Sequence, residues 1–440
     1  MTAHDGVGVT ENLVKVTDQY IKSEQYRGGS FDGQYFHQKV HTKLDEHYAA
    51  KGFHTIDPMH RAGTVDIHLR KEKRFQWLVE MTVLVGQAFK VVNYGKEFQH
   101  FFEVVQALIE LEYDVKFKFP RFYSETKFAN YVRLVYMNFR ETFPGLVRTF
   151  EESQARLNKG DSENRKKAKT ISDIQGKIMS LKVNLHLSGS CDVYERFGHE
   201  INILQTVNML PHTKYDNFVE IAVNGLKTMS ETVDPADCSC QGKFESTNCL
   251  WKILHKDLKD INEHNQYRGV PVGRLMADEL HTRQGRRREQ ENLLLDKKGL
   301  VKKCLKQLSE LADEMSKKLL KDVFDEATKE VINCVRNVLD LETLARQVKM
   351  CGSPHVAALG SVQFIESARK IVSDLSEISD QELRLQFNTF LSRLEDYVED
   401  IDEDNLNSLK IFKDFLDTKL SLYKGIEMII HEFWRHLNEC

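Results

Sequence analysis

The sequence predicts a mainly α fold, in which a small α/β segment precedes a long series of helices. Only 7 prolines and 23 glycines occur in 440 residues, whereas a β-sandwich or barrel needs a turn about every 8–12 residues. From about Phe75 onward, apolar residues recur at the spacing of a helix face. Hydrophobic residues make up 41% of the chain and charged residues 29%, which is typical of a globular protein and too apolar for a disordered one.

The first 70 residues contain the α/β segment. Residues 11–25 and 35–48 predict helices, and the glycine-rich run 25–33 between them predicts a loop. Residues 52–56 are short and include a β-branched pair, which predicts a strand. The following Asp57-Pro58 predicts a helix start, with the aspartate as N-cap and the proline at the first helical position.

Local signals also place later helices and breaks. Ser124 predicts the N-cap of a helix, and the polar run 158–168 predicts an exposed connection. Helical segments are expected at about 170–187 and 193–230, followed by an irregular loop at 232–272. The helix that Ser124 caps is predicted to bury Phe128, Tyr131, Leu134, Val135 and Phe139.

A long helix is predicted from about residue 289, followed by a break at 352–361 and further helices. We expect three parts: a partial core at 1–70, a helical insertion-type domain at 71–351 and a C-terminal helical segment at 352–440. Such a division suits the length, because a single core stops growing at about 250–300 residues. The long helix is predicted to pack through Cys304, Leu308, Leu311, Met315 and Leu319.

Charge is distributed unevenly along the chain. Residues 281–321 carry twelve Lys or Arg against six Asp or Glu, and residues 371–407 carry eleven acids against two arginines. The basic stretch is able to contact phosphates and the acidic one would repel them. Solvated helix faces are the alternative for both stretches.

If any surface binds DNA, we expect it in the basic stretch. Lys298 and Lys302 are four residues apart, so they are able to follow one phosphate strand. Such binding would be weak, indifferent to sequence and steeply salt-dependent. The alternatives are a solvated helix start and a basic signal for nuclear import. The predicted face contains Arg283, Arg286, Arg287, Arg288, Lys297, Lys298, Lys302 and Lys303.

The segment 57–68 is the richest in chemically useful side chains. Asp57, His60, Asp66 and His68, together with Asp32, would suit a divalent metal ion. In the alternative reading, Asp57 is only a helix cap, His60 makes an ordinary hydrogen bond, and Asp66 and His68 face solvent.

The eight cysteines are scattered along the chain and do not follow the regular spacing of a disulfide framework, which predicts free thiols in a reducing compartment. Four residues spaced C-x-C-x8-C-x5-H are an alternative zinc site, although zinc clusters usually contain C-x2–4-C pairs. These residues are Cys238, Cys240, Cys249 and His255. The sequence shows neither an apolar run long enough to cross a bilayer nor a secretory signal, so we expect no membrane contact.

Several short motifs together resemble transposases of the hAT superfamily. In the amino-terminal part these are SFDGQYF at 30–36, DPMH at 57–60 and SETKF at 124–128. The segment LSG at 187–189 with DVYE at 192–195, and LYKGIE at 422–427, are similar to the long helical part of animal members. The resemblance covers most of the chain, and no single motif is as specific as a zinc finger.

This resemblance implies a ribonuclease H-like core into which a large helical domain is inserted. The family's core holds two metal ions with Asp, Asp and Glu, and the metals activate water for strand cleavage and transfer. Asp32 matches the second aspartate of that set. His60 looks like the histidine of the family's Cys-x-x-His element, with Asp57 where the cysteine would be.

The sequence departs from the family pattern at the catalytic residues. Only 31 residues precede Asp32, and neither the first aspartate nor the glutamate is found. We therefore expect a transposase-derived, non-catalytic DNA- or protein-contact module, nuclear rather than cytoplasmic and without a cofactor. One alternative is an active DNA strand-transfer nuclease that uses Mg²⁺ or Mn²⁺ at Asp32, Asp57 and His60. The other is a helical scaffold unrelated to DNA.

Overall fold

The computed structural model is mainly helical in the part of the chain that it describes, which confirms the predicted mainly α class. It describes residues 6–20, 28–31, 35, 37–49, 53–94, 129–205, 211–232, 250–276, 290–371, 378–402, 406 and 411. The chain forms two compact units. Unit 1 consists of residues 1–204 and 218–323, and unit 2 of residues 205–217 and 324–440.

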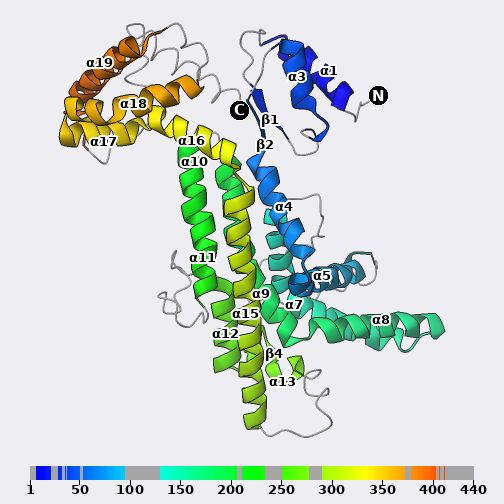
Figure 1. The fold of residues 1–440 in the computed structure, drawn as a ribbon. Coiled ribbons are helices and arrows are strands. Elements are labelled where there is room, and N and C mark those ends of the chain that lie inside the picture. The colour runs from blue at the N-terminus through cyan, green and yellow to red at the C-terminus, as the bar shows by residue number, and fades with distance from the viewer. Residues whose placement is uncertain are drawn as a thin grey trace. The chain divides into compact units, whose positions relative to one another are not determined.

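Unit 1 begins with two helices and a pair of short strands. Helix α1 (Gly6–Thr17) packs against α3 (Val40–Tyr48), and β1 (Gly28–Phe31) pairs in parallel with β2 (Phe53–Ile56) (Figure 1). The predicted strand at 52–56 is therefore confirmed. The prediction of a loop over the whole glycine-rich run is wrong at residues 28–31. These residues form strand β1, because their backbone N–H and C=O groups pair with those of β2. Of the predicted metal ligands, Asp32 lies outside the described residues.

Helix α4 (Pro58–Arg70) starts where the sequence predicts. The Asp57 carboxylate accepts a hydrogen bond from the Met59 N–H at 3.0 Å, so it caps the helix. A short 3₁₀ turn, η2 (Lys73–Phe75), leads into α5 (Gln76–Tyr94).

The next two described helices are α7 (Ala129–Leu157) and α8 (Ser162–Ile178), which pack against each other. The prediction of an exposed connection at 158–168 is wrong for its second half. Helix α8 already begins at Ser162, and the Asp161 carboxylate caps it by accepting the Asn164 N–H at 2.9 Å. The predicted cap Ser124 and Phe128 lie outside the described residues.

Within α7, the predicted buried face is only partly correct. Val135 and Phe139 are buried, but Leu134 is 37% exposed. Its side chain therefore faces solvent and not the helices against which α7 packs.

Helix α9 (Leu181–Gln205) follows, and η3 (Phe218–Val223, a π-helical turn) continues into α11 (Asn224–Glu231). The prediction of an irregular loop at 232–272 is wrong for its described part. Helix α12 (Lys252–Glu263) has a strongly amphipathic face that buries Leu254, Leu258 and Ile261.

A two-stranded antiparallel hairpin follows α12. Its strands β3 (Gln266–Tyr267) and β4 (Val270–Pro271) are joined by Arg268 and Gly269, whose φ angles are 48° and 79°. Positive φ at both turn residues is the geometry of a type I′ hairpin turn. The short helix α13 (Val272–Leu275) comes next.

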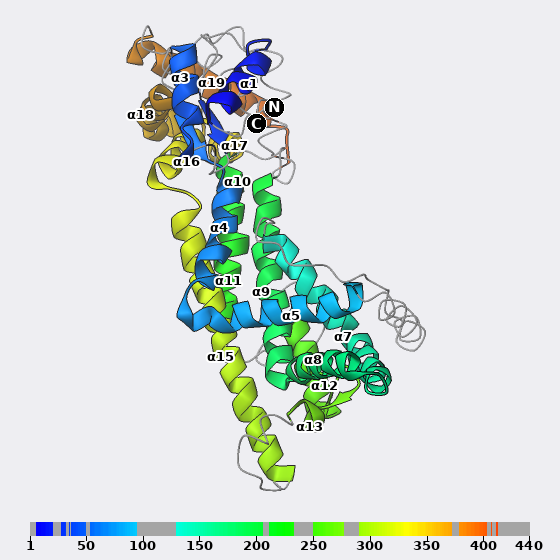
Figure 2. The same cartoon turned by 90° about the vertical axis from the view of Figure 1, so that its right-hand side faces the viewer.

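The longest described helix is α15 (Gln290–Asp322), which confirms the prediction of a long helix from about residue 289. Helices α4 and α11 run beside α15 in both views (Figure 1, Figure 2), whereas α8 extends sideways away from these long helices in Figure 1. The five residues predicted to form its packing stripe, Cys304, Leu308, Leu311, Met315 and Leu319, are all buried.

Unit 2 contains α10 (Pro211–Asn217), α16 (Glu326–Leu339), α17 (Leu341–Cys351), α18 (Ser353–Ile371) and α19 (Asp380–Val398). Its core includes Phe364 and Phe387, whose rings stack with centroids 4.1 Å apart.

The predicted break at 352–361 is wrong for most of its length, because α18 begins at Ser353. Only Gly352, with φ at 80°, interrupts the helices there. Within the described ranges, no helix is both long and apolar enough to cross a membrane.

Candidate functional site

Helix α9 takes part in several groups of buried polar contacts. Its segment 187–195 includes two of the motifs that carry the hAT resemblance. Side chains of this segment contact α4, α7 and α12, and Gly189 lies against Leu308 of α15, so one short sequence joins α9 to four other helices of unit 1.

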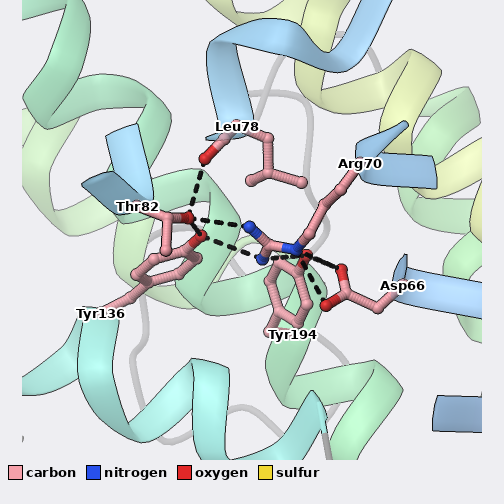
Figure 3. Close-up of polar contacts among 6 residues, drawn as sticks. All are labelled: Asp66, Arg70, Leu78, Thr82, Tyr136 and Tyr194. Carbon is pink, nitrogen blue, oxygen red and sulfur yellow. Dashed lines mark hydrogen bonds and ion pairs between the residues drawn. The ribbon is translucent and has the colours of Figure 1, made fainter. Parts of the chain in front are cut away.

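Arg70 is the centre of the first group of contacts (Figure 3). Its Nε donates to both oxygens of Asp66, at 3.0 and 2.9 Å, and its terminal nitrogens donate to Thr82 at 2.8 Å and to Tyr194 at 2.9 Å. The Tyr194 hydroxyl also donates to Asp66. Tyr136 accepts from Arg70 at 3.2 Å and bonds the Thr82 hydroxyl at 2.6 Å.

This group is closed to solvent. Asp66 is 3% exposed, and the rings of Tyr136 and Tyr194 are fully buried. Burial raises the pKa of both tyrosines, so both remain neutral donors. Because every charge and hydroxyl has a partner inside the protein, the group stabilises the junction of α4, α5, α7 and α9.

Asp257 of α12 is the centre of the second group. Its carboxylate accepts from Arg140 of α7 at 2.7 and 3.0 Å and from the hydroxyl of Ser188. Ser188 is also 3.2 Å from the Tyr267 hydroxyl of the hairpin. A bidentate arginine–carboxylate pair of this kind fixes the relative orientation of the two helices that carry it.

Asp192 of α9 caps α12 from outside that helix. Its two oxygens accept the backbone N–H of Ile253 at 3.0 and 3.1 Å, and one accepts that of Leu254 at 2.9 Å. Burial raises the pKa of Asp192 to about 7, although the N–H donors act in the opposite direction.

His186 occupies a dry position between α5 and α15. Its ring stacks on Trp77 with centroids 4.2 Å apart, and its Nε2 lies 3.1 Å from Gln307 Oε1. Burial, assisted by the charges of Lys182 and Lys303, lowers the pKa of His186 to about 3. The imidazole is therefore neutral at physiological pH.

Gly189 allows α9 and α15 to approach closely. A Cβ atom at this position would lie 2.2 Å from a methyl carbon of Leu308, which is far inside van der Waals contact. The glycine of the LSG motif thus has a packing reason, because only a residue without a side chain leaves room for Leu308.

The predicted metal ligands are not brought together in the described residues. Asp57 is engaged as a helix cap, which agrees with the alternative reading. His60 is half-buried and His68 is exposed. Asp66 was expected to face solvent, and this is wrong because Arg70, one helical turn later, and the distant Tyr194 hold it in the core. The described residues contain no group of three or more His, Cys, Asp or Glu able to hold a metal ion.

Of the lysines in the predicted basic face, three are exposed and one is buried. Lys298, Lys302 and Lys303 are exposed on α15. Lys297 does not belong to this face: it is 4% exposed, its Nζ donates to the Ile261 carbonyl at 3.2 Å, and burial lowers its pKa. It points inward because it lies about 100° around the helix from Lys298. The predicted Arg283, Arg286, Arg287 and Arg288 lie outside the described residues.

Of the four residues considered for zinc, Cys238, Cys240 and Cys249 also lie outside the described residues, and His255 lies on α12.

Sequence reasoning missed Arg70, Arg140 and Asp257. The i,i+4 spacing of Asp66 and Arg70 was available as a signal for an ion pair, but nothing local indicates that the pair is buried. Arg140 and Asp257 are 117 residues apart, so only the fold reveals that contact.

Comparisons of this chain with protein-family models, with curated proteins and with solved structures gave no match.

Proposed function

We propose that this chain is a transposase-derived protein that acts by contact with DNA rather than by catalysis, in the nucleus. Two sequence features support the proposal: the resemblance to hAT transposases and the basic stretch at 281–321. The buried polar groups around α9 are compatible with it, since Asp66, Asp192 and Asp257 are all occupied in joining helices.

The single observation that carries DNA contact is the exposed lysine face of α15. Lys298 and Lys302 lie on successive turns. Lys306 continues the same side of the helix at 78% side-chain exposure, with its Nζ 4.0 Å from Glu310 Oε1. In the described part of the chain, neither Lys298 nor Lys302 forms an ion pair. Ammonium groups spaced in this way contact phosphates without reading bases.

Binding of a labelled DNA duplex, measured across a series of salt concentrations, tests the proposal. The triple variant Lys298→Gln/Lys302→Gln/Lys303→Gln is expected to make the plot of log K against log salt shallower by about 2.7, because each phosphate contact contributes about 0.9. An unchanged slope would remove this face as the contact surface. Absence of binding by the parent protein would favour a helical scaffold unrelated to DNA.

A parallel assay with Mg²⁺ or Mn²⁺ addresses the nuclease alternative. We expect no strand cleavage by the purified chain, because two-metal hydrolysis needs ligands for both ions and only Asp32 matches the family's set. Metal-dependent nicking that disappears in Asp32→Ala would overturn the non-catalytic part of the proposal.

A further inference from the structure

Helix α8 presents a second basic face, which the sequence reading did not predict. Its inner side buries Ala168, Ile171 and Ile178. Arg165, Lys166 and Lys169 are exposed on the opposite side, within about 100° of arc, because of the 100° turn per residue.

The cations on this face exceed the acids that are able to neutralise them. Residues 159–177 carry six Lys or Arg against three Asp or Glu. Two of those acids are already engaged, since Asp161 caps the helix and Glu163 pairs with Lys167 at 2.9 Å. The third, Asp173, is exposed one turn beyond Lys169 on the same side of the helix. Over the ranges that the structure describes, Arg165, Lys166 and Lys169 form no ion pair, which leaves three charges available to a ligand.

The spacing of these charges suits a regular row of phosphates. Arg165 and Lys169 lie on successive turns, about 6 Å apart along the helix axis, with Lys166 beside them. The N-terminus of α8 is not part of this face, because Asp161 caps it by accepting the Asn164 N–H.

The same face is unsuited to a lipid surface. An interfacial helix inserts large apolar side chains beside its cations, but the exposed large hydrophobic residues of the described chain include none on α8. The exposed positions that follow the cations along the helix are small or polar, such as Ser172, Asp173 and Gly176. The chemistry therefore favours a nucleic acid backbone.

We infer that the outer face of α8, formed by Arg165, Lys166 and Lys169, is a docking surface for the phosphate backbone of duplex DNA, separate from the lysine face of α15. The inference rests on the proposed function in that DNA is the partner, but it assigns contacts that neither the resemblance nor the basic stretch at 281–321 includes. It predicts that the protein neutralises phosphates through two helices.

The test compares three triple variants of the full chain in the salt-dependent duplex assay. One is Arg165→Gln/Lys166→Gln/Lys169→Gln on α8, and the second is the α15 variant described above. The third, a control, removes the same charge from exposed lysines of helices other than α8 and α15, and consists of Lys90→Gln on α5, Lys227→Gln on α11 and Lys259→Gln on α12.

The α8 variant is expected to make the salt dependence shallower by about 2.7, the value for three phosphates, while the control variant retains the parental slope. Because the three side chains are exposed, its circular dichroism and unfolding midpoint should equal those of the parent.

An α8 variant that binds DNA like the parent would overturn the inference. If the α15 variant loses affinity in the same experiment, the proposed function remains intact. Equal losses in the α8 and control variants would also overturn it, since net charge alone would then explain the effect. Loss of binding to phosphatidylserine vesicles with unchanged DNA binding would assign the face to membranes instead.

Discussion

Replacing His186 by Gln should remove a defined part of the acid sensitivity of unit 1. The imidazole is 3% exposed, and its burial against Trp77 lowers its pKa to about 3. The unfolded chain binds a proton at this residue near pH 6.5, whereas the folded protein does not until about pH 3. A base whose pKa is lowered by folding contributes stability above its unfolded pKa, and that contribution is lost as pH falls from 6.5 toward 3.

The magnitude follows from the two pKa values. At pH 5 the unfolded state gains about 2 kcal/mol from protonation of this one residue relative to pH 8, while the folded state gains almost nothing. The free energy of unfolding of the parent should therefore fall by about 2 kcal/mol more between pH 8 and pH 5 than that of His186→Gln. Glutamine retains a donor for Gln307, so the variant is expected to fold.

Denaturant titration followed by tryptophan fluorescence measures this difference. Trp77 and Trp251 both lie in unit 1 and are buried, so they report on its unfolding. The matched control is His68→Gln, which removes an exposed imidazole from α4 and should retain the parental pH dependence. Identical pH dependence in the parent and in His186→Gln would refute the reasoning, because it would mean that His186 is protonated equally in both states.

Three further changes test the contacts around α9. Gly189→Ala should lower the free energy of unfolding by about 1–3 kcal/mol, because the new methyl group overlaps Leu308. Gly176→Ala should raise the free energy of unfolding by about 0.5–1 kcal/mol, because its methyl group would meet no neighbouring atom on the open side of α8. Denaturant titration of both variants tests these opposite signs. Arg70→Met should cost about 3–5 kcal/mol, because Asp66 keeps a buried charge without its cation, and the loss should shrink when Asp66→Asn is added. Asp192→Ala should cost about 1–2 kcal/mol by removing the acceptor for the first turn of α12, with faster amide exchange there, while Asp192→Asn should retain most of the protection.

The sequence predicted a helix and its buried side correctly where apolar residues recur along one face of that helix. The stripe from Cys304 to Leu319 is regular over several turns, so α15 and its buried side were predictable. Helix α8 was partly missed because only Ala168, Ile171 and Ile178 are buried on it, which is too few to make a visible stripe among so many charges. Asp57-Pro58 was predictable as a helix start because capping is local.

The candidate site was less predictable because its contacts are not local. Asp66 meets Tyr194 across 128 residues, and Gly189 is required by Leu308 on another helix. Nothing near Asp66 in the sequence distinguishes a solvated carboxylate from a buried one. Lys297 and Lys298 show the same limit, since these adjacent lysines have identical chemistry but one is buried and the other is exposed.

The long reach of the α9 contacts has a consequence for how the protein matures. During synthesis, α4 leaves the ribosome well before Tyr194 exists to bond Asp66, and α9 before Leu308 exists to pack on Gly189. Contacts between distant parts of a chain form slowly because the intervening loop must first be closed. Asp66 has Arg70 as a partner within α4, but Arg140 has no carboxylate partner until Asp257 of α12 is made, and α9 is not covered at Gly189 until α15 is made. Unit 1 should therefore remain exposed to chaperones and proteases until translation has passed residue 323.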